Sequence, residues 1–246
     1  MPLADKDVAR SLTTRLIQEH AQFKATVLVR FNRAGSKDFE EDCRWLKDLR
    51  VDGVLLGKCQ SAQETRYLAD VMDQMNVAAQ VRVYALIESA AGIVNAAAIA
   101  SSCSRMASLV FGSEDYCADV GISRTSGDTE LLFARSSLVT TSKAFGLGAI
   151  DSACLDLKDN VRLRNEAQAA RNLGFDGKLA IHPRQIAVLN ELFSPTEAEI
   201  ENAHKVIAAF SASSLGVLKV DGRMIDEAVV RRARQVLSLR KADARS

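Results

Sequence analysis

The sequence predicts an α/β fold built on a parallel β-sheet. Short apolar segments of strand character recur six times along the chain, near residues 27, 54, 84, 108, 152 and 180, and each is followed by a segment with helical spacing. Regular alternation of strands and helices is typical of a parallel sheet, either open or closed into a barrel. With 246 residues, one large domain of this kind or two small ones is expected.

The first part of the chain alternates helices with two strands that end in basic residues. The opening helix is indicated by Val8, Leu12 and Leu16, which recur at helical spacing. Arg30 follows the first strand and Lys58 follows the second. The expected elements are helices at 5–21, at 39–49 and from a capping box at 61–64, with strands at 26–29 and 54–56.

Two apolar strands in the centre of the chain end in acidic residues. The strand at 83–87 stops at Glu88, and the strand at 107–111 stops before Glu114 and Asp115. The alanine-rich stretch between them is long enough for a helix that returns the chain to the same end of the sheet. The two strands are therefore expected to be parallel and joined by a right-handed crossover.

The carboxyl ends of parallel strands line the active site in α/β folds. Glu88 is therefore expected to lie beside Asp115 or Glu114. Two converging carboxylates without a nearby thiol or imidazole suit a hard cation such as Mg²⁺, completed by water and substrate oxygens. An alternative interpretation stays open, in which each acid caps a following helix or pairs with an arginine.

The second half continues the alternation and then becomes mainly helical. Residues 121–128 are polar and contain two glycines, and we expect them to form an active-site loop. A small hairpin or turn is expected at 215–223. The predicted domains are a β/α barrel domain at 1–212 and a C-terminal turn and helix at 213–246. The other expected elements are helices at 95–102, 131–145, 160–173, 194–212 and 224–241, and strands at 149–157 and 178–181.

Composition narrows the classes of function. Thirty-two basic and 31 acidic residues leave a net charge of +1, so no global field favours nucleic acid or an anionic membrane. Five scattered cysteines without a CxxC pair indicate a reducing compartment rather than a disulfide framework. No apolar run approaches the roughly 20 residues of a membrane span. We expect an intracellular protein, cytoplasmic or in the mitochondrial matrix, that acts on a small molecule.

Four separated segments resemble one known family. They are LIESAAGIVNAAAIA, LVFGSEDYCADVG, GFDGKLAIHPRQIAVLNELFSP and VDGRMIDEAVVRRARQV. Together they are similar to the citrate lyase beta-subunit-like branch of the HpcH/HpaI aldolases, which includes malyl-CoA and citramalyl-CoA lyases. The resemblance implies a TIM-type (β/α)8 barrel, Mg²⁺ as cofactor, a trimer, and cleavage or formation of carbon–carbon bonds in 3-hydroxyacyl-CoA thioesters.

The resemblance also implies roles for individual residues. Glu88 and Asp115 match the metal-binding acids, with Glu88 also near the substrate. Arg30, in VRFN, matches an arginine that holds the substrate and takes part in catalysis. Without the resemblance, the alternative is that Arg30 pairs with a surface acid.

Further positions match with different specificity. Asp226 matches a catalytic acid that reaches the active site of a neighbouring subunit, although it is also suited to the start of a helix. Ile150, Asp151 and His182 match segments that line the coenzyme A channel. His182 precedes a proline, which favours a positioning or turn residue over a general base. Gly57 stands where the family has a proline before the lysine.

The largest departure from the family lies at the start. Full-length relatives would have two further strands before the segment PLADKDVAR, so six of eight barrel strands are expected here, with a C-terminal helical extension. Eight strands close a barrel of this type. Three functions therefore stay open: a Mg²⁺-dependent acyl-CoA lyase giving a 2-oxo acid and acetyl-CoA, an impaired homologue that binds metal or CoA or regulates full-length subunits, and a metal-dependent aldolase on free 4-hydroxy-2-oxo acids.

Overall fold

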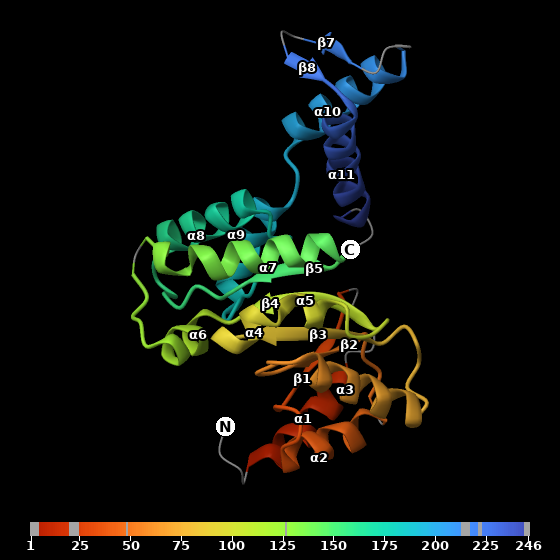
Figure 1. The fold of residues 1–246 in the computed structure, drawn as a ribbon, viewed down its shortest axis with the longest axis vertical. Coiled ribbons are helices and arrows are strands. Elements are labelled where there is room, and N and C mark those ends of the chain that lie inside the picture. Colours follow the sequence, from red (N-terminus) through yellow and green to blue (C-terminus); the bar gives the residue numbers. More distant parts are fainter. Residues whose placement is uncertain are drawn as a thin grey trace. The chain divides into compact units, whose positions relative to one another are not determined.

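The computed structural model describes residues 5–19, 25–47, 49–125, 127–212, 217–220 and 223–243. It divides into two compact units, residues 1–185 and residues 186–246 (Figure 1). Within the described residues, no helix is both long and apolar enough to cross a membrane.

The first unit is built on a six-stranded parallel sheet, which confirms the predicted α/β fold. Its strands lie in the order in which they occur in the chain, and each pairs with its sequence neighbours. This consecutive order is that of a TIM-type barrel wall. Among the described residues, β1 and β6 form the two edges of the sheet. The strands are β1 (Leu28–Phe31), β2 (Gly53–Leu56), β3 (Arg82–Ile87), β4 (Met106–Phe111), β5 (Gly148–Asp151) and β6 (Gly177–Lys178).

Helices alternate with the strands, as predicted. They are α1 (Lys6–Glu19), α2 (Lys37–Leu46), α3 (Ala62–Gln74), α4 (Ala90–Val94), α5 (Ala96–Ala100), α6 (Ser113–Val120), α7 (Leu132–Ala144), α8 (Asn160–Leu173) and α9 (Pro183–Phe193), with a 3-10 turn at Thr129–Leu131. The predicted capping box of α3 is present: Ser61 and Glu64 satisfy each other's backbone amides.

Several predicted bounds were wrong. The expected helix at 95–102 is two short helices, α4 and α5, that begin earlier because Ser89 caps α4 and accepts from the Gly92 amide at 3.1 Å. The strand expected to reach 157 ends at Asp151, since its hydrogen-bonded partner β6 is only two residues long. Arg30 lies inside β1, not after it, because Phe31 is buried and still pairs with Leu56.

The core lies between the sheet and its helices. Strand residues such as Val54, Val83, Leu109 and Phe111 are fully buried. Strands that are covered on both faces become almost continuously apolar, which explains why they are recognisable in the sequence. Burying one such side chain contributes about 1.5–3 kcal/mol. These rigid strands hold the polar residues at their carboxyl ends in fixed positions.

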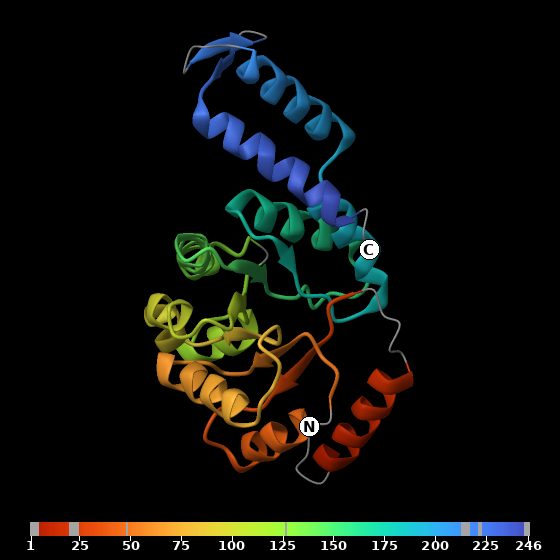
Figure 2. The ribbon, with the colours of Figure 1, turned by 90° about the vertical axis from the view of Figure 1, so that its right-hand side faces the viewer.

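Helix α1 lies beside α2 (Figures 1 and 2), and the contacts between them are mainly polar. Arg10 pairs with Asp42 at 2.8 Å, and Lys6 pairs with Asp38. The apolar residues that predicted this helix, Val8, Leu12 and Leu16, are exposed. Residues 20 and 21 of the predicted helix lie outside the described residues.

The second unit holds most of α9, followed by a helix pair and a hairpin. It comprises α10 (Glu197–Ser211), antiparallel β7 (Leu218–Val220) and β8 (Arg223–Ile225), and α11 (Glu227–Asp243). Ala203, Val206, Ile225, Val230 and Ala233 form its core. The hairpin was expected at 215–223, of which 215, 216, 221 and 222 lie outside the described residues. The predicted domain boundary after residue 212 falls inside this unit, between two helices that share that core.

Candidate active site

Glu88 follows β3 at the carboxyl end of the sheet and is 6% exposed. The backbone amide of Lys58, just after β2, donates to Glu88 Oε1 at 2.9 Å. Arg30 Nη2, from β1, lies 3.7 Å from the same oxygen. Burial raises the pKa of Glu88 above its usual range, Arg30 opposes this rise and Asp115 adds to it.

Gly112 makes room for the Glu88 side chain. It follows β4, and its backbone amide donates to Ile87 O at 2.9 Å. A Cβ atom at this position would lie 2.6 Å from Glu88 Cβ and 2.8 Å from Glu88 Oε2. The glycine of the FGSED segment is therefore required by close approach of a side chain from the neighbouring strand.

Asp115 lies in the first turn of α6, which begins at Ser113 directly after Gly112. Lys58 Nζ lies 3.1 Å from Asp115 Oδ1, and this hydrogen bond lowers the pKa of Asp115. The two carboxyl groups also affect each other: Asp115 raises the pKa of Glu88, and Glu88 lowers the pKa of Asp115. The structure thus brings together the two acids that the sequence analysis paired.

The features of the alternative interpretation are present as well. Asp115 is a first-turn acid of a helix, and Glu88 has an arginine within ion-pair distance. The contact to Arg30 is weak, since the Arg30 side chain is 58% exposed and water screens it. Neither the helix position of Asp115 nor the Arg30 contact of Glu88 separates the two acids.

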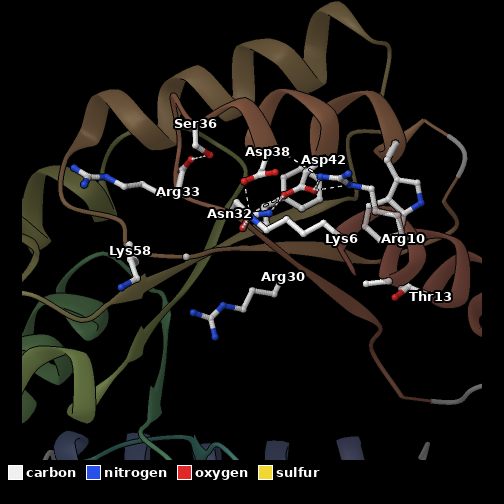
Figure 3. A pocket seen from close by; sticks show the side chains of 14 residues that line it. Lys6, Arg10, Thr13, Arg30, Asn32, Arg33, Ser36, Asp38, Asp42 and Lys58 are labelled. Atoms are coloured by element: carbon white, nitrogen blue, oxygen red, sulfur yellow. Dashed lines mark hydrogen bonds and ion pairs between the residues drawn. The ribbon is translucent and has the colours of Figure 1, made fainter. Parts of the chain in front are cut away.

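The two acids line a cavity of about 280 Å³. A larger pocket of about 660 Å³ lies between α1, α2 and the ends of β1 and β2 (Figure 3). Lys58 and Arg33 line both, and Arg30 lines the larger one. In Figure 3, Lys6 and Arg10 meet Asp38 and Asp42, whereas Arg30 and Lys58 extend away from those acids. The remaining residues of the smaller cavity are Gln60, Ser89, Ala118 and Asp119.

Glu88 and Asp115 fit a small divalent cation that prefers oxygen ligands. Mg²⁺ is bound through one or two carboxylates, with its other positions filled by water and substrate oxygens. Such a cation would relieve the contact between two acids, one of them buried. No group of three or more His, Cys, Asp or Glu side chains suited to a metal occurs in the described part of the chain. The fit is therefore to a two-carboxylate site and not to a cage made wholly of protein ligands.

Asp151 ends β5 and is fully buried. Arg135 donates to both of its carboxylate oxygens at 3.1 and 3.0 Å, and Lys178 Nζ lies 2.9 Å from Asp151 Oδ2. Its neighbour Ile150 is half-buried on the same strand. Neither residue lines the 280 Å³ cavity or the 660 Å³ pocket, and their part in a coenzyme channel stays a prediction.

Asp151 belongs to a buried ion-pair network that the sequence analysis missed. Lys178 also lies 3.3 Å from Glu166, whose carboxylate is 3.0 Å from Arg124. Arg124 in turn pairs with Asp128 at 2.7 Å and with Glu114 at 3.4 Å. The network thus connects strands β5 and β6 with the 121–128 loop and with the residue next to Asp115.

Two predicted residues make local contacts at helix starts. His182 precedes α9, and its Nδ1 accepts from the Arg184 amide at 3.1 Å, as a turn residue would. Asp226 precedes α11, and its Oδ1 accepts from the Val229 amide at 3.0 Å, as a helix-initiating acid would. Asp226 lies in the second unit, so its function stays a prediction.

The chain is similar to one family of known proteins over most of its length. Residues 1–183 match the family described as HpcH/HpaI aldolase/citrate lyase. The chain is 33% identical to the citrate lyase subunit beta of Leuconostoc mesenteroides subsp. cremoris, over 98% of this chain and 82% of that protein. It is 31% identical to the mitochondrial citramalyl-CoA lyase of Homo sapiens, over 86% of this chain and 67% of that protein.

A solved structure supports the same grouping. CitE from Mycobacterium tuberculosis, in complex with magnesium, acetoacetate and coenzyme A, is similar with a TM-score of 0.79 and 29% identity, over 97% of this chain and 85% of that one. A citrate lyase from Burkholderia xenovorans LB400 has a TM-score of 0.87 at 20% identity, over 100% of this chain and 82% of that one. The second likeness concerns the fold alone.

Proposed function

The chain belongs to the HpcH/HpaI aldolase/citrate lyase family of carbon–carbon lyases, and we propose that it acts on a 3-hydroxyacyl-CoA thioester of the citramalyl-CoA or malyl-CoA type. The products would be a 2-oxo acid and acetyl-CoA. The observation that carries the proposal is the convergence of Glu88 and Asp115 in one cavity, with Arg30 and Lys58 within 4 Å of their carboxylates. The M. tuberculosis structure with magnesium and coenzyme A supports the choice of cofactor and substrate class.

Glu88 and Asp115 would hold the divalent cation, Mg²⁺. When bound, this ion supplies positive charge that lowers the pKa of the substrate hydroxyl and stabilises developing negative charge. Arg30 would bind the carboxylate or carbonyl oxygens of the 2-oxo acid portion, since a guanidinium forms paired hydrogen bonds with such oxygens. Preorganised positive charge around these oxygens is the largest contribution expected to the rate.

In the cleavage direction the substrate hydroxyl gives its proton to a water molecule, and the adjacent carbon–carbon bond breaks. The electron pair of that bond passes to the acetyl-CoA enolate, and the hydroxyl carbon becomes the carbonyl of the 2-oxo acid. Asp226, from a neighbouring subunit of a homotrimer, would deliver a proton to the enolate carbon or remove it in the condensation direction. Ile150, Asp151 and His182 are proposed to lie along the path of the coenzyme.

An assay with matched substrates tests the proposal. The purified protein is incubated with citramalyl-CoA, malyl-CoA or a free 4-hydroxy-2-oxo acid in the presence of Mg²⁺, and the 2-oxo acid and acetyl-CoA are quantified by chromatography. We expect release of both products from a CoA thioester, loss of turnover with EDTA and recovery with excess Mg²⁺. Turnover of only the free acid would replace the proposal with the aldolase alternative. Metal binding without any turnover would favour an impaired homologue.

A further inference from the structure

Lys58 contacts both acids of the candidate metal site with two different groups. Its backbone amide donates to Glu88 Oε1 at 2.9 Å, and its side-chain Nζ donates to Asp115 Oδ1 at 3.1 Å. The side chain is about half exposed and lines the cavity that holds both carboxylates. Lys58, which follows β2, therefore connects the end of β3 with the first turn of α6.

The backbone of Lys58 is in a conformation that a lysine rarely adopts. Its φ is +54°, in the left-handed region. The two flanking residues hold it there: the Gly57 amide donates to Phe31 O at 3.2 Å and the Cys59 amide donates to Leu86 O at 3.0 Å. In this left-handed conformation the amide of Lys58 reaches the carboxylate of Glu88, and its side chain reaches that of Asp115. Strained backbone that is held by its surroundings concentrates at functional sites.

The Lys58 ammonium group is hydrogen-bonded to Asp115 Oδ1, an oxygen that the proposed ion would also bind. Glu88 is buried and Asp115 lies against it, so together they need a positive charge nearby. Lys58 supplies that charge in the metal-free protein. When a divalent ion binds both acids, it competes with the Lys58 ammonium for Asp115, and two cations on one carboxylate repel each other. The flexible, half-exposed side chain can leave this oxygen without any movement of the backbone.

We propose that Lys58 is a positioning residue that stands in for the divalent ion in the metal-free protein and turns to the anionic end of the substrate once the ion is bound. The inference rests on the proposed function, since it assumes that Glu88 and Asp115 hold the ion. The Lys58 ammonium group thus has two successive partners: first Asp115, then a carboxylate oxygen of the 2-oxo acid portion.

The variant Lys58→Gly tests this exchange. Glycine keeps the amide that donates to Glu88 and is favoured at φ +54°, so only the ammonium and its stem are lost. Mg²⁺ binding without substrate is measured by calorimetry, and the thermal midpoint is measured with and without Mg²⁺. We expect Mg²⁺ to bind about three- to tenfold more tightly to Lys58→Gly than to the natural protein, with a larger Mg²⁺-induced rise in the midpoint.

Substrate binding should change in the opposite direction. With saturating Mg²⁺, the affinity of Lys58→Gly for pyruvate should fall by about tenfold, since the ammonium group that binds the pyruvate carboxylate is missing. Lys58→Arg should keep most of this affinity. Arg33→Met is the matched control: Arg33 lines the same cavity but pairs with Glu64 and Gln60, so its loss should change Mg²⁺ affinity less than about twofold.

The outcomes separate the two proposals. If the natural protein binds Mg²⁺ and Lys58→Gly binds it equally or more weakly, Lys58 does not stand in for the ion, and the proposed function is unaffected. Unchanged pyruvate affinity in Lys58→Gly contradicts the second step alone. If the natural protein binds no Mg²⁺ at millimolar concentration, the proposed metal site fails, and this inference fails with it.

Discussion

Gly112 and Glu88 are in such close contact that a single added carbon would displace the acid. A Cβ atom on Gly112 would lie 2.6 Å from Glu88 Cβ and 2.8 Å from Glu88 Oε2, closer than non-bonded atoms approach. The contact connects the end of β4 to the end of β3. It also explains why a small residue separates the buried strand from the α6 segment that carries Asp115.

Gly112→Ala should therefore impair metal binding while the fold survives. The added methyl group pushes the Glu88 carboxylate away from Asp115, and we expect Mg²⁺ affinity to fall by about tenfold or more. Calorimetric titration with Mg²⁺ measures the change. Gly177→Ala is the control, because a Cβ there meets nothing within 4 Å. Equal Mg²⁺ affinity in both variants would show that the position of Glu88 is not set by Gly112.

Neutralising either acid should weaken the site more selectively. Glu88→Gln and Asp115→Asn each remove one negative charge with little change in shape, and we expect Mg²⁺ affinity and activity to fall by at least about 10- to 100-fold. Asp119→Asn provides the comparison: Asp119 lines the same cavity, but its carboxylate accepts from the Ala90 amide at 2.8 Å. A loss in Asp119→Asn as large as in the other two would indicate a general effect of charge and not ligation.

The buried ion-pair network should make stability depend on acid pH. Burial opposes ionisation of Glu166, but Lys178, Arg162 and Arg124 outweigh it and hold the pKa of Glu166 below its usual range. Burial likewise opposes ionisation of Asp128, and Arg124 lowers its pKa. A carboxyl group whose pKa is lowered by folding stabilises the protein above its unfolded pKa, near 4. That stabilisation is lost as the pH falls through the lower pKa of the folded state.

Glu166→Gln tests this contribution. The variant leaves Lys178 and Arg124 with less compensating charge, and we expect a loss of about 3–5 kcal/mol in the free energy of unfolding at pH 7. The loss should shrink as the pH falls from about 5 to about 2, because the unfolded chain takes up the Glu166 proton near pH 4 and the folded protein does so only at a lower pH. Urea unfolding followed by circular dichroism at several pH values measures both. A difference that stays constant across this range would contradict the assigned pKa direction.

The predictable features were those that leave a local pattern in the sequence. Apolar strands, the capping box at Ser61 and the acids after β3 and β4 all follow from short segments, and the family motifs pointed to the same acids. The left-handed backbone of Lys58 has no such pattern, since lysine is not a residue of left-handed turns. Likewise, Glu166 shares a helix with Arg162 four residues away and resembles a solvated face; only long-range packing shows that it is buried.

Asp226 provides a test of assembly as well as chemistry. If this acid acts in the site of a neighbouring subunit, Asp226→Asn and Glu88→Gln damage different chains of the same site. Each variant alone should be nearly inactive. When both are co-expressed, subunits mix at random in a homotrimer, and about one quarter of the sites would combine an intact Glu88 with an intact Asp226 from its neighbour. We therefore expect recovery of about a quarter of the natural activity in the citramalyl-CoA assay, with the trimer verified by light scattering. If Asp226 acts within its own chain, every site carries one of the two substitutions. No activity then returns on mixing.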